Sequence, residues 1–555
     1  MRKSFFLVAA ASVLSACGSK EGTQSAGGTG GTMIFAAASD AEAIFPPFVK
    51  DVIGRMVQDQ VFDRLAEINN QLTTVGDKEF TPRLAQKWTW ARDSLSIAFS
   101  IDPRARWHDG KPVTAADVRY TYKTLSDPKV GSTVASTLGN LDSVTVRDSL
   151  TAVIWFKKHT PEQFYDAAYQ LVIMPEHVYG KIPPEQLHTS DATRTIVGSG
   201  RFRLVRWDAG SRIELLSDTG NYRGRARLDR IIIVKTDPST ETAQLLSGQA
   251  DFMEAFPNDQ VAKLDSNAFA RPLPIQQVGY GFMGMNRFVP KSTTTPHPIF
   301  SDIRVRRALS MAVDRVGMLR NIYGDKGRLS HGPFPMTLLV GDSTLRLPPY
   351  DTTAAKAMLD SSGWRVGSDG IRAKNGRPFR FTLISTTSSL PRRRYGILLQ
   401  EQFRRIGVQV DFDNMDPQAY FPRMNAGDFD AIMAANVTDP SVSGSKQSWG
   451  TSGIGADGQN YMRYSNPKAD AFLDSATSSF DPVKTKGYAS RAFQTIIDDV
   501  PAVWLYDLVT VDAVNSRIDA APVRADGWWA NLADWSIPPN KRIDRDRIGL
   551  ATPKS

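Results

Sequence analysis

Apolar residues along this chain alternate between two spacings, and this alternation constrains the fold more than any other feature. In residues 95–101, LSIAFSI, apolar side chains occupy alternate positions, which predicts a half-buried β-strand. In residues 392–407, RRRYGILLQEQFRRIG, they recur every three or four positions, which predicts a helix. Strand patterns flank that helix at 379–385 and 408–415, so the stretch is predicted to form a strand–helix–strand unit. The whole chain is therefore predicted to be α/β, with several lobes and mixed sheets.

Other patterns place individual elements. Residues 301–324 are predicted to be one amphipathic helical stretch, 502–514 a pair of strands, and 141–156 a hairpin. A helix is predicted to begin after Thr114, because a threonine caps a first turn well and Asp117 at the third helical position completes a variant of the capping box.

Composition excludes several classes of protein. The chain has 555 residues, 41% hydrophobic and 23% charged, which is ordinary for a globular protein and long enough for several domains. With one cysteine and six histidines it can hold neither a disulfide framework nor a cysteine-rich zinc site. The net charge is +9, but basic and acidic residues alternate and no run of five basic residues occurs. We therefore expect no nucleic-acid partner and no metal or other cofactor.

The N-terminal residues predict export and a lipid anchor. The chain opens MRKSFFLVAAASVLSAC, with a charged start, a short apolar run and small residues before Cys17. This arrangement is typical of a secretory signal and is too short to span a membrane. Residues 14–17, Leu-Ser-Ala-Cys, have the form of a bacterial lipobox, so 1–17 is predicted to be a lipoprotein signal peptide ending in a lipidated Cys17. The alternative is a plain signal peptide with an unrelated cysteine.

A tether follows the cysteine. Residues 18–32 are rich in glycine, serine and threonine and lack apolar periodicity, which predicts a flexible linker spanning on the order of 20 Å. The folded part is expected to begin near Met33. No later apolar run reaches 18 residues. We therefore expect a protein in the periplasm or at the cell surface, anchored to a membrane by lipidated Cys17.

Motifs of the common hydrolases are missing from the sequence. There is no H-E-x-x-H, no G-x-x-x-x-G-K-[ST] and no G-x-S-x-G. The histidines are isolated from one another: His108, His159, His177, His188, His297 and His331. We expect no enzymatic activity. The alternative is a secreted hydrolase, for which His108 is the best catalytic candidate.

Residues 83–122 carry the most specific motif, RLAQKWTWARDSLSIAFSIDPRARWHDGKPVTAADVRYTY. They resemble the signature region of the bacterial extracellular solute-binding proteins of family 5, which feed peptide and nickel ABC importers. The family's aromatic-His-Asp-Gly turn and its Pro-x-Thr-Ala-x-Asp-Val helix start are both present. Elementary physics explains the motif without catalysis: Asp109-Gly110 favours a tight turn, and Trp107 is expected in the core. His108 is accordingly expected to be structural.

The resemblance extends from about Met33 to at least Tyr506 and implies an architecture. The family has a two-lobed periplasmic-binding-protein fold (type II, cluster C) with an extra domain on the first lobe. The implied boundaries are as follows: first lobe 33–68, 193–276 and 500–555; extra domain 69–192; second lobe 277–499. In such proteins a ligand binds between the lobes and stabilises the closed form, which is then presented to a membrane permease.

The resemblance also implies a ligand site. In peptide-binding members an aspartate twelve residues after a glycine turn pairs with the ligand's α-ammonium, and counting from Gly427 gives Asp439. Backbone groups of Ala435 and Val437 would bind an extended peptide as an added strand. Asn436, Trp449 and Asp40 complete the expected ligand-binding residues. The alternatives are that Asp439-Pro440 is only a turn and that aromatic residues such as Trp449 belong to the core.

Two departures from the family bear on the ligand. Thr386 and Thr387 stand where the dipeptide-binding branch has an arginine for the ligand carboxylate, which disfavours a strict dipeptide. Asn436 stands where peptide binders often have tryptophan, and its amide would also suit a sugar hydroxyl. We expect a monomer whose partners are an oligopeptide, ABC permease subunits and a lipid anchor. The alternative ligand is a non-peptide solute such as an oligosaccharide or opine.

Overall fold

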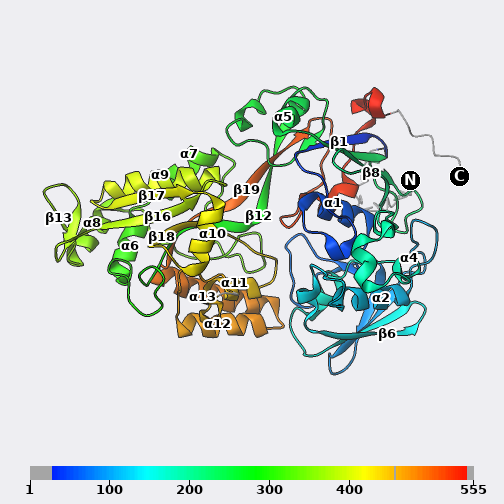
Figure 1. The fold of residues 1–555 in the computed structure, drawn as a ribbon, viewed down its shortest axis with the longest axis horizontal. Helices are drawn as coiled ribbons and strands as arrows, with labels where there is room; N and C mark the ends of the chain where they lie inside the picture. The colour runs from blue at the N-terminus through cyan, green and yellow to red at the C-terminus, as the bar shows by residue number, and fades with distance from the viewer. Residues whose placement is uncertain (1–27, 456–457, 547–555) are drawn as a thin grey trace, which may run out of the picture.

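The computed structural model describes residues 28–455 and 458–546, which form two lobes joined by a pair of long strands (Figure 1). Ten strands make one sheet through both lobes, in the order β17-β16-β18-β12-β19-β11-β1-β10-β9-β8. The first lobe contains β1 (Thr32–Ala37), β8 (Phe202–Asp208), β9 (Arg212–Ser217), β10 (Arg230–Lys235) and β11 (Phe252–Met253). The second lobe contains β16 (Arg380–Thr386), β17 (Gln409–Met415) and β18 (Ala431–Val437).

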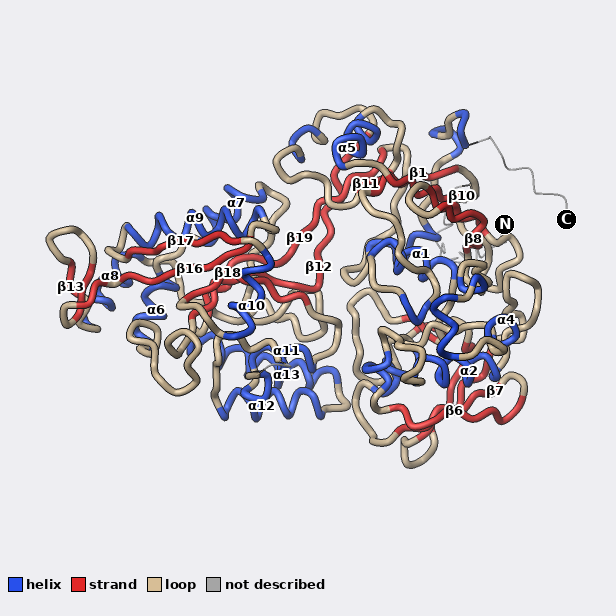
Figure 2. Tube along the Cα trace, viewed as in Figure 1, coloured by secondary structure: helices blue, strands red, loops and turns tan. Residues whose placement is uncertain are grey.

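The connecting strands are β12 (Ala270–Met285) and β19 (Ala502–Asn515), which pair antiparallel along most of their length. Figure 2 shows both running from one lobe into the other. Their register shifts between Gln276 and Tyr280, at the point where the two strands pass between the lobes. The prediction of a strand pair at 502–514 is wrong, because these residues lie in one strand, β19, which pairs with β12 on both sides of this shift.

The second lobe confirms the predicted strand–helix–strand unit. β16 and β17 are parallel, and α9 (Leu390–Arg404) connects them and packs on both. The helical stretch predicted at 301–324 is two helices, α6 (Ile303–Met311) and α7 (Arg315–Tyr323). It breaks because the Asp314 side chain accepts a hydrogen bond from the Gly317 N–H (2.9 Å) and so caps a new helix. The remaining helices of this lobe are α8 (Thr352–Ser361), α10 (Pro417–Ala426), α11 (Ser443–Trp449), α12 (Pro467–Ser478) and α13 (Pro482–Asp499).

The extra domain surrounds a four-stranded antiparallel sheet, β4-β5-β7-β6, at the foot of the first lobe (Figure 1). Its strands are β4 (Ala85–Trp90), β5 (Ser96–Ile101), β6 (Leu141–Asp148) and β7 (Thr151–Phe156), so the hairpin predicted at 141–156 is confirmed. Its helices include α2 (Ala115–Ser126), α3 (Gln163–Ala168) and α4 (Glu176–Tyr179), and α1 (Val52–Val61) and α5 (Pro238–Leu246) belong to the first lobe. The short strands outside these sheets are β2 (Ala66–Glu67), β3 (Thr81–Pro82), β13 (Arg365–Val366), β14 (Arg372–Lys374) and β15 (Arg377–Pro378).

The signature region of the extra domain is built as its chemistry predicts. The Asp117 carboxylate accepts a hydrogen bond from the Thr114 N–H (2.8 Å), which confirms the capping box at the start of α2. Trp107 is buried and its indole N–H lies 3.3 Å from the same carboxylate. Both His108 ring nitrogens lie within hydrogen-bonding distance of backbone groups, at Gly198 N (3.3 Å) and Gly200 O (3.0 Å). Burial lowers the pKa of His108, so the ring is a neutral structural bridge.

The folded part begins slightly before Met33. The Gly30 N–H donates to the Arg227 carbonyl (2.7 Å), and the Gly31 N–H donates to the Asp229 carboxylate (3.0 Å). The last residues of the predicted tether are thus packed on the first lobe, whereas Cys17 and the predicted signal peptide lie outside the described residues. Among the described residues, no helix has the length and apolar character needed to cross a membrane.

Candidate functional site

The carboxyl ends of β16, β17 and β18 meet at one edge of the second lobe's sheet, which faces the first lobe. In open α/β sheets this edge is where ligands bind, because loops and helix starts converge there. β16 and β18 pair only at the Ala431 and Ile432 positions of β18, so its later residues have no strand beside them on that side among the described residues. The Tyr420 hydroxyl donates to the Met433 carbonyl (2.7 Å). Beyond it, β18 can accept an extended ligand along its free edge.

Asp439 stands directly after this free edge. Its carboxylate accepts one hydrogen bond within the described residues, from the Ser441 N–H (2.8 Å), and forms no ion pair there. The side chain is solvent-accessible, yet the surrounding protein desolvates the carboxylate and raises its pKa. The partly desolvated Asp439 carboxylate therefore has no countercharge among the described residues, and the ammonium group of a ligand would supply one.

Asn436 and Trp449 lie beneath the edge rather than at it. The Asn436 amide and the Trp449 indole N–H both donate to the Tyr280 hydroxyl, at 3.0 and 2.7 Å. Asn436 is 4% exposed and Trp449 has no exposed surface, so neither side chain offers a ligand contact in this conformation. Of their neighbours on β18, Ala435 is half-buried and Val437 is 65% exposed. The structure thus brings Asn436 and Trp449 together as a support for the site.

Asp40 lies in the first lobe, just after β1. Its carboxylate accepts hydrogen bonds from the Ala41 N–H (2.8 Å) and from the Gly210 N–H in the β8–β9 turn. Within the described part of the chain, no hydrogen bond or ion pair joins it to the loop that carries Asp439. The structure therefore does not bring Asp40 together with the other predicted residues.

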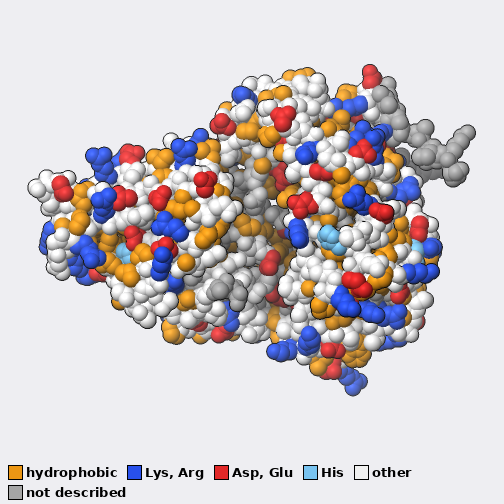
Figure 3. Space-filling view, viewed as in Figure 1, with side chains coloured by type: hydrophobic (Ala, Val, Ile, Leu, Met, Phe, Trp, Pro, Cys, Tyr) orange, Lys and Arg blue, Asp and Glu red, His pale blue; other side chains and the backbone are white. Residues whose placement is uncertain are grey.

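Glu162, which no sequence pattern singles out, links the extra domain to the second lobe. Its carboxylate accepts hydrogen bonds from the Ser441 hydroxyl (2.5 Å) and the Val442 N–H (3.3 Å), both in the loop after Asp439. The Thr74 hydroxyl of the extra domain fixes the same carboxylate (2.6 Å). Nearby, the rings of His159 and Phe480 lie 4.2 Å apart across the same gap. These contacts hold the second lobe against the extra domain. Figure 3 shows that the face of the molecule is hollowed between the two lobes.

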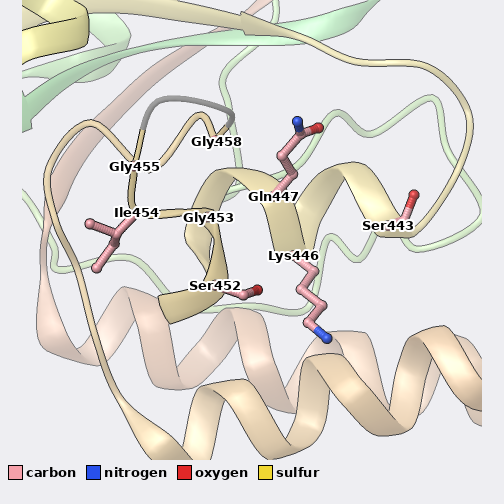
Figure 4. Close-up of a pocket in the computed structure, with 8 residues that line it drawn as sticks. All are labelled: Ser443, Lys446, Gln447, Ser452, Gly453, Ile454, Gly455 and Gly458. Atoms are coloured by element: carbon pink, nitrogen blue, oxygen red, sulfur yellow. The ribbon is translucent and has the colours of Figure 1, made fainter. Parts of the chain in front are cut away.

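A separate cavity of about 360 Å³ lies beside α11 (Figure 4). Glycines and polar residues form much of its wall, including Ser443, Ser452, Gly453 and Gly455. Figure 4 shows Lys446 turned toward the neighbouring helices, where its ammonium pairs with Asp474 (2.5 Å). The cavity thus presents no free charge of Lys446 to a ligand. Within the described residues no group of three metal-ligating side chains occurs.

A sequence model of the family "bacterial extracellular solute-binding proteins, family 5 (middle)" matches residues 79–456 of this chain. The chain belongs to this family. The chain is 28% identical over 537 residues to protein XP55 of Streptomyces lividans, and the matched region covers 95% of this chain and 91% of that protein. It is 27% identical to the oligopeptide-binding protein AppA of Bacillus subtilis over 422 residues, covering 74% of this chain and 75% of AppA.

Solved structures of other solute-binding proteins share the fold of this family 5 chain. The structure of B. subtilis AppA in complex with a nonapeptide matches with a TM-score of 0.68 and 23% identity, covering 92% of this chain and 99% of AppA. CtaP of Listeria monocytogenes, an ABC transporter substrate-binding protein, matches with a TM-score of 0.77 and 20% identity, covering 92% of this chain and all of CtaP. The predicted fold class is confirmed: an α/β, two-lobed type II periplasmic-binding-protein fold with an extra domain.

Proposed function

We propose that this protein is the substrate-binding component of an ABC importer, which captures an oligopeptide between its lobes and delivers it to a membrane permease. One observation carries the proposal: the free edge of β18 is followed two residues later by Asp439, a carboxylate that has no ion-pair partner among the described residues. An extended peptide offers both complementary features, a backbone that can pair with a strand edge and an N-terminal ammonium that can pair with the acid.

Closure around the ligand would follow from the two connecting strands. β12 and β19 change register between Gln276 and Tyr280, so bending there would move the lobes as rigid bodies. A peptide that contacts both lobes only when they are closed shifts the population toward the closed form by its differential affinity. The boundary proposed between the first and second lobes, at 276/277, coincides with this register shift.

The remaining assignments belong to the same proposal. The signal sequence and lipidated Cys17 would anchor the protein to a membrane, in the periplasm or at the cell surface, as a monomer beside its permease. The other three boundaries, 68/69, 192/193 and 499/500, are proposed on the family architecture alone.

Two observations favour a peptide over the alternatives. The Asn436 amide, which would suit a sugar hydroxyl, is already hydrogen-bonded to Tyr280. His108, the candidate base of a hydrolase, uses its ring to bridge backbone groups in the signature turn. We therefore propose binding without catalysis.

Isothermal titration calorimetry with penta-alanine and with N-acetyl penta-alanine tests the proposal. We expect the free-amine peptide to bind at least tenfold more tightly, because losing a charge-assisted hydrogen bond costs about 1.5–3 kcal/mol. Equal affinities for the two peptides, or binding of neither, would contradict it.

A further inference from the structure

One face of α3 is turned toward the loop that carries Asp439. Glu162, Tyr165 and Asp166 are spaced i, i+3 and i+4, and the Asp166 N–H donates to the Glu162 carbonyl (3.0 Å), so the three side chains share one helical face. Glu162 is hydrogen-bonded to Ser441 in that loop. Tyr165 and Asp166 of the extra domain therefore lie opposite the acid of the second lobe.

Asp166 has no partner of its own. Within the described residues its carboxylate accepts no hydrogen bond and forms no ion pair, and the charges that act on it come from Glu162 and Asp439, both acids. Burial and these two like charges raise the pKa of Asp166 to about 7. The charge of Asp439 in the second lobe thus acts on Asp166 in the extra domain, and neither carboxylate forms an ion pair with a described basic residue.

Tyr165 supplies a second, independent observation. It is 4% exposed, yet its hydroxyl makes no hydrogen bond to any described residue. Its ring stacks on Tyr169 at 5.4 Å, and Tyr169 is in turn fixed by its hydrogen bond to Asp526 (2.8 Å). Among the charged groups that act on the Tyr165 hydroxyl, Asp439 has the largest effect. The hydroxyl oxygen itself keeps some solvent exposure and has no partner among the described residues, so it is free to hydrogen-bond to a ligand in this space.

We propose that Asp166 and Tyr165, together with Asp439, form a site for two cationic groups of the ligand, so that the protein selects peptides whose first residue is basic. This inference rests on the proposed function. The α-ammonium pairs with Asp439, and the side-chain ammonium of the first residue pairs with Asp166 and donates a hydrogen bond to the Tyr165 oxygen. A peptide with an apolar first residue leaves Asp166 uncompensated when the lobes close, and specificity follows from that penalty.

Calorimetry with two matched pentapeptides tests the site: lysine followed by four alanines, and norleucine followed by four alanines. We expect wild-type protein to bind the lysine peptide about ten- to a hundredfold more tightly. Asp166→Asn should remove most of this preference, and Tyr165→Phe should reduce it several-fold. Asp191→Asn, an exposed acid of the same domain, is the matched control and should leave the preference unchanged.

The outcomes separate this inference from the proposed function. If both peptides bind equally to wild type, or if Asp166→Asn keeps the lysine preference, the site is wrong while peptide capture stands. If neither free-amine peptide binds, both proposals fall. Thermal unfolding followed by circular dichroism provides a readout independent of binding. Asp166→Asn should unfold at the same or a higher temperature at pH 8, because it removes a like charge, and a lower unfolding temperature would show a structural role instead.

Discussion

Replacing Asp439 by asparagine separates its charge from its role in the turn. The asparagine side chain keeps a carbonyl oxygen that can accept the Ser441 N–H hydrogen bond, so the loop is expected to keep its conformation. The variant loses only the negative charge that would pair with a ligand ammonium. A change in affinity at unchanged stability would therefore report the ammonium contact directly.

The expected magnitude follows from the surroundings of Asp439. Removing one partner of an exposed ion pair costs up to about 1 kcal/mol, and of a buried pair about 3–5 kcal/mol. The Asp439 side chain is solvent-accessible but desolvated enough to raise its pKa, so an intermediate loss of about 2–3 kcal/mol is expected. This corresponds to a roughly 30- to 150-fold increase in Kd for penta-alanine.

The pH dependence gives a second test of the same residue. Only the ionised carboxylate attracts an ammonium, so wild-type affinity should fall as the pH is lowered through the raised pKa of Asp439. The Asp439→Asn variant lacks this group and should lose that part of the pH dependence. Calorimetry across the acidic range measures both, with circular dichroism to confirm folding. An unaltered Kd at neutral pH in a folded variant would refute the ammonium role.

Three further predictions concern the contact between the extra domain and the second lobe, a buried charge on β19, and the packing of β12 against β19. Glu162→Gln and Ser441→Ala should each weaken penta-alanine binding several-fold. Because the two side chains share one hydrogen bond between the extra domain and the second lobe, their effects should be non-additive in a double-mutant cycle. Additive losses would contradict a role for this hydrogen bond in closure. Asp507 on β19 is 3% exposed, and burial raises its pKa to about 7. Between about pH 4 and pH 7 the folded protein therefore binds more protons than the unfolded chain, so the free energy of unfolding falls as the pH rises through this range. Asp507→Asn should therefore raise the free energy of unfolding most at pH 8, by up to about 4 kcal/mol, and by less toward pH 4. Denaturant unfolding measures this change, and a change that does not depend on pH would contradict the raised pKa of Asp507. A Cβ on Gly281 would lie 2.2 Å from the Tyr506 ring, so Gly281→Ala should destabilise by about 1–3 kcal/mol, whereas Gly220→Ala, with no atom within 4 Å, should change stability by less than about 0.5 kcal/mol.

Local chemistry made much of the fold predictable. The cap at Thr114 depends on Asp117 three residues away, and the β16–α9–β17 unit depends on spacings within 37 residues of chain, 379–415. The family signature around Trp107 added the two-lobed architecture, which the comparisons confirm. Where prediction was wrong, a distant partner decided the outcome: β19 is one strand because β12, more than two hundred residues earlier, pairs along it.

The site was less predictable for the same reason. Asn436 and Trp449 are held by Tyr280, which lies 156 and 169 residues away in the sequence. Glu162 contacts Ser441 over a separation of 279 residues, and no local pattern marks either residue as a partner of the other. Asp439 was placed by its spacing from Gly427 in the family pattern, and its ligand role stays a prediction.

Native mass spectrometry of the mature protein, without its lipid and purified from a bacterial periplasm, tests the central claim most directly. Binding proteins of this kind can retain their cargo through purification when dissociation is slow. The account predicts a series of bound masses that fragment into amino-acid residues. A single non-peptide mass, or an empty protein that later closes on sugars but not on peptides, would contradict peptide capture and leave the fold unchanged.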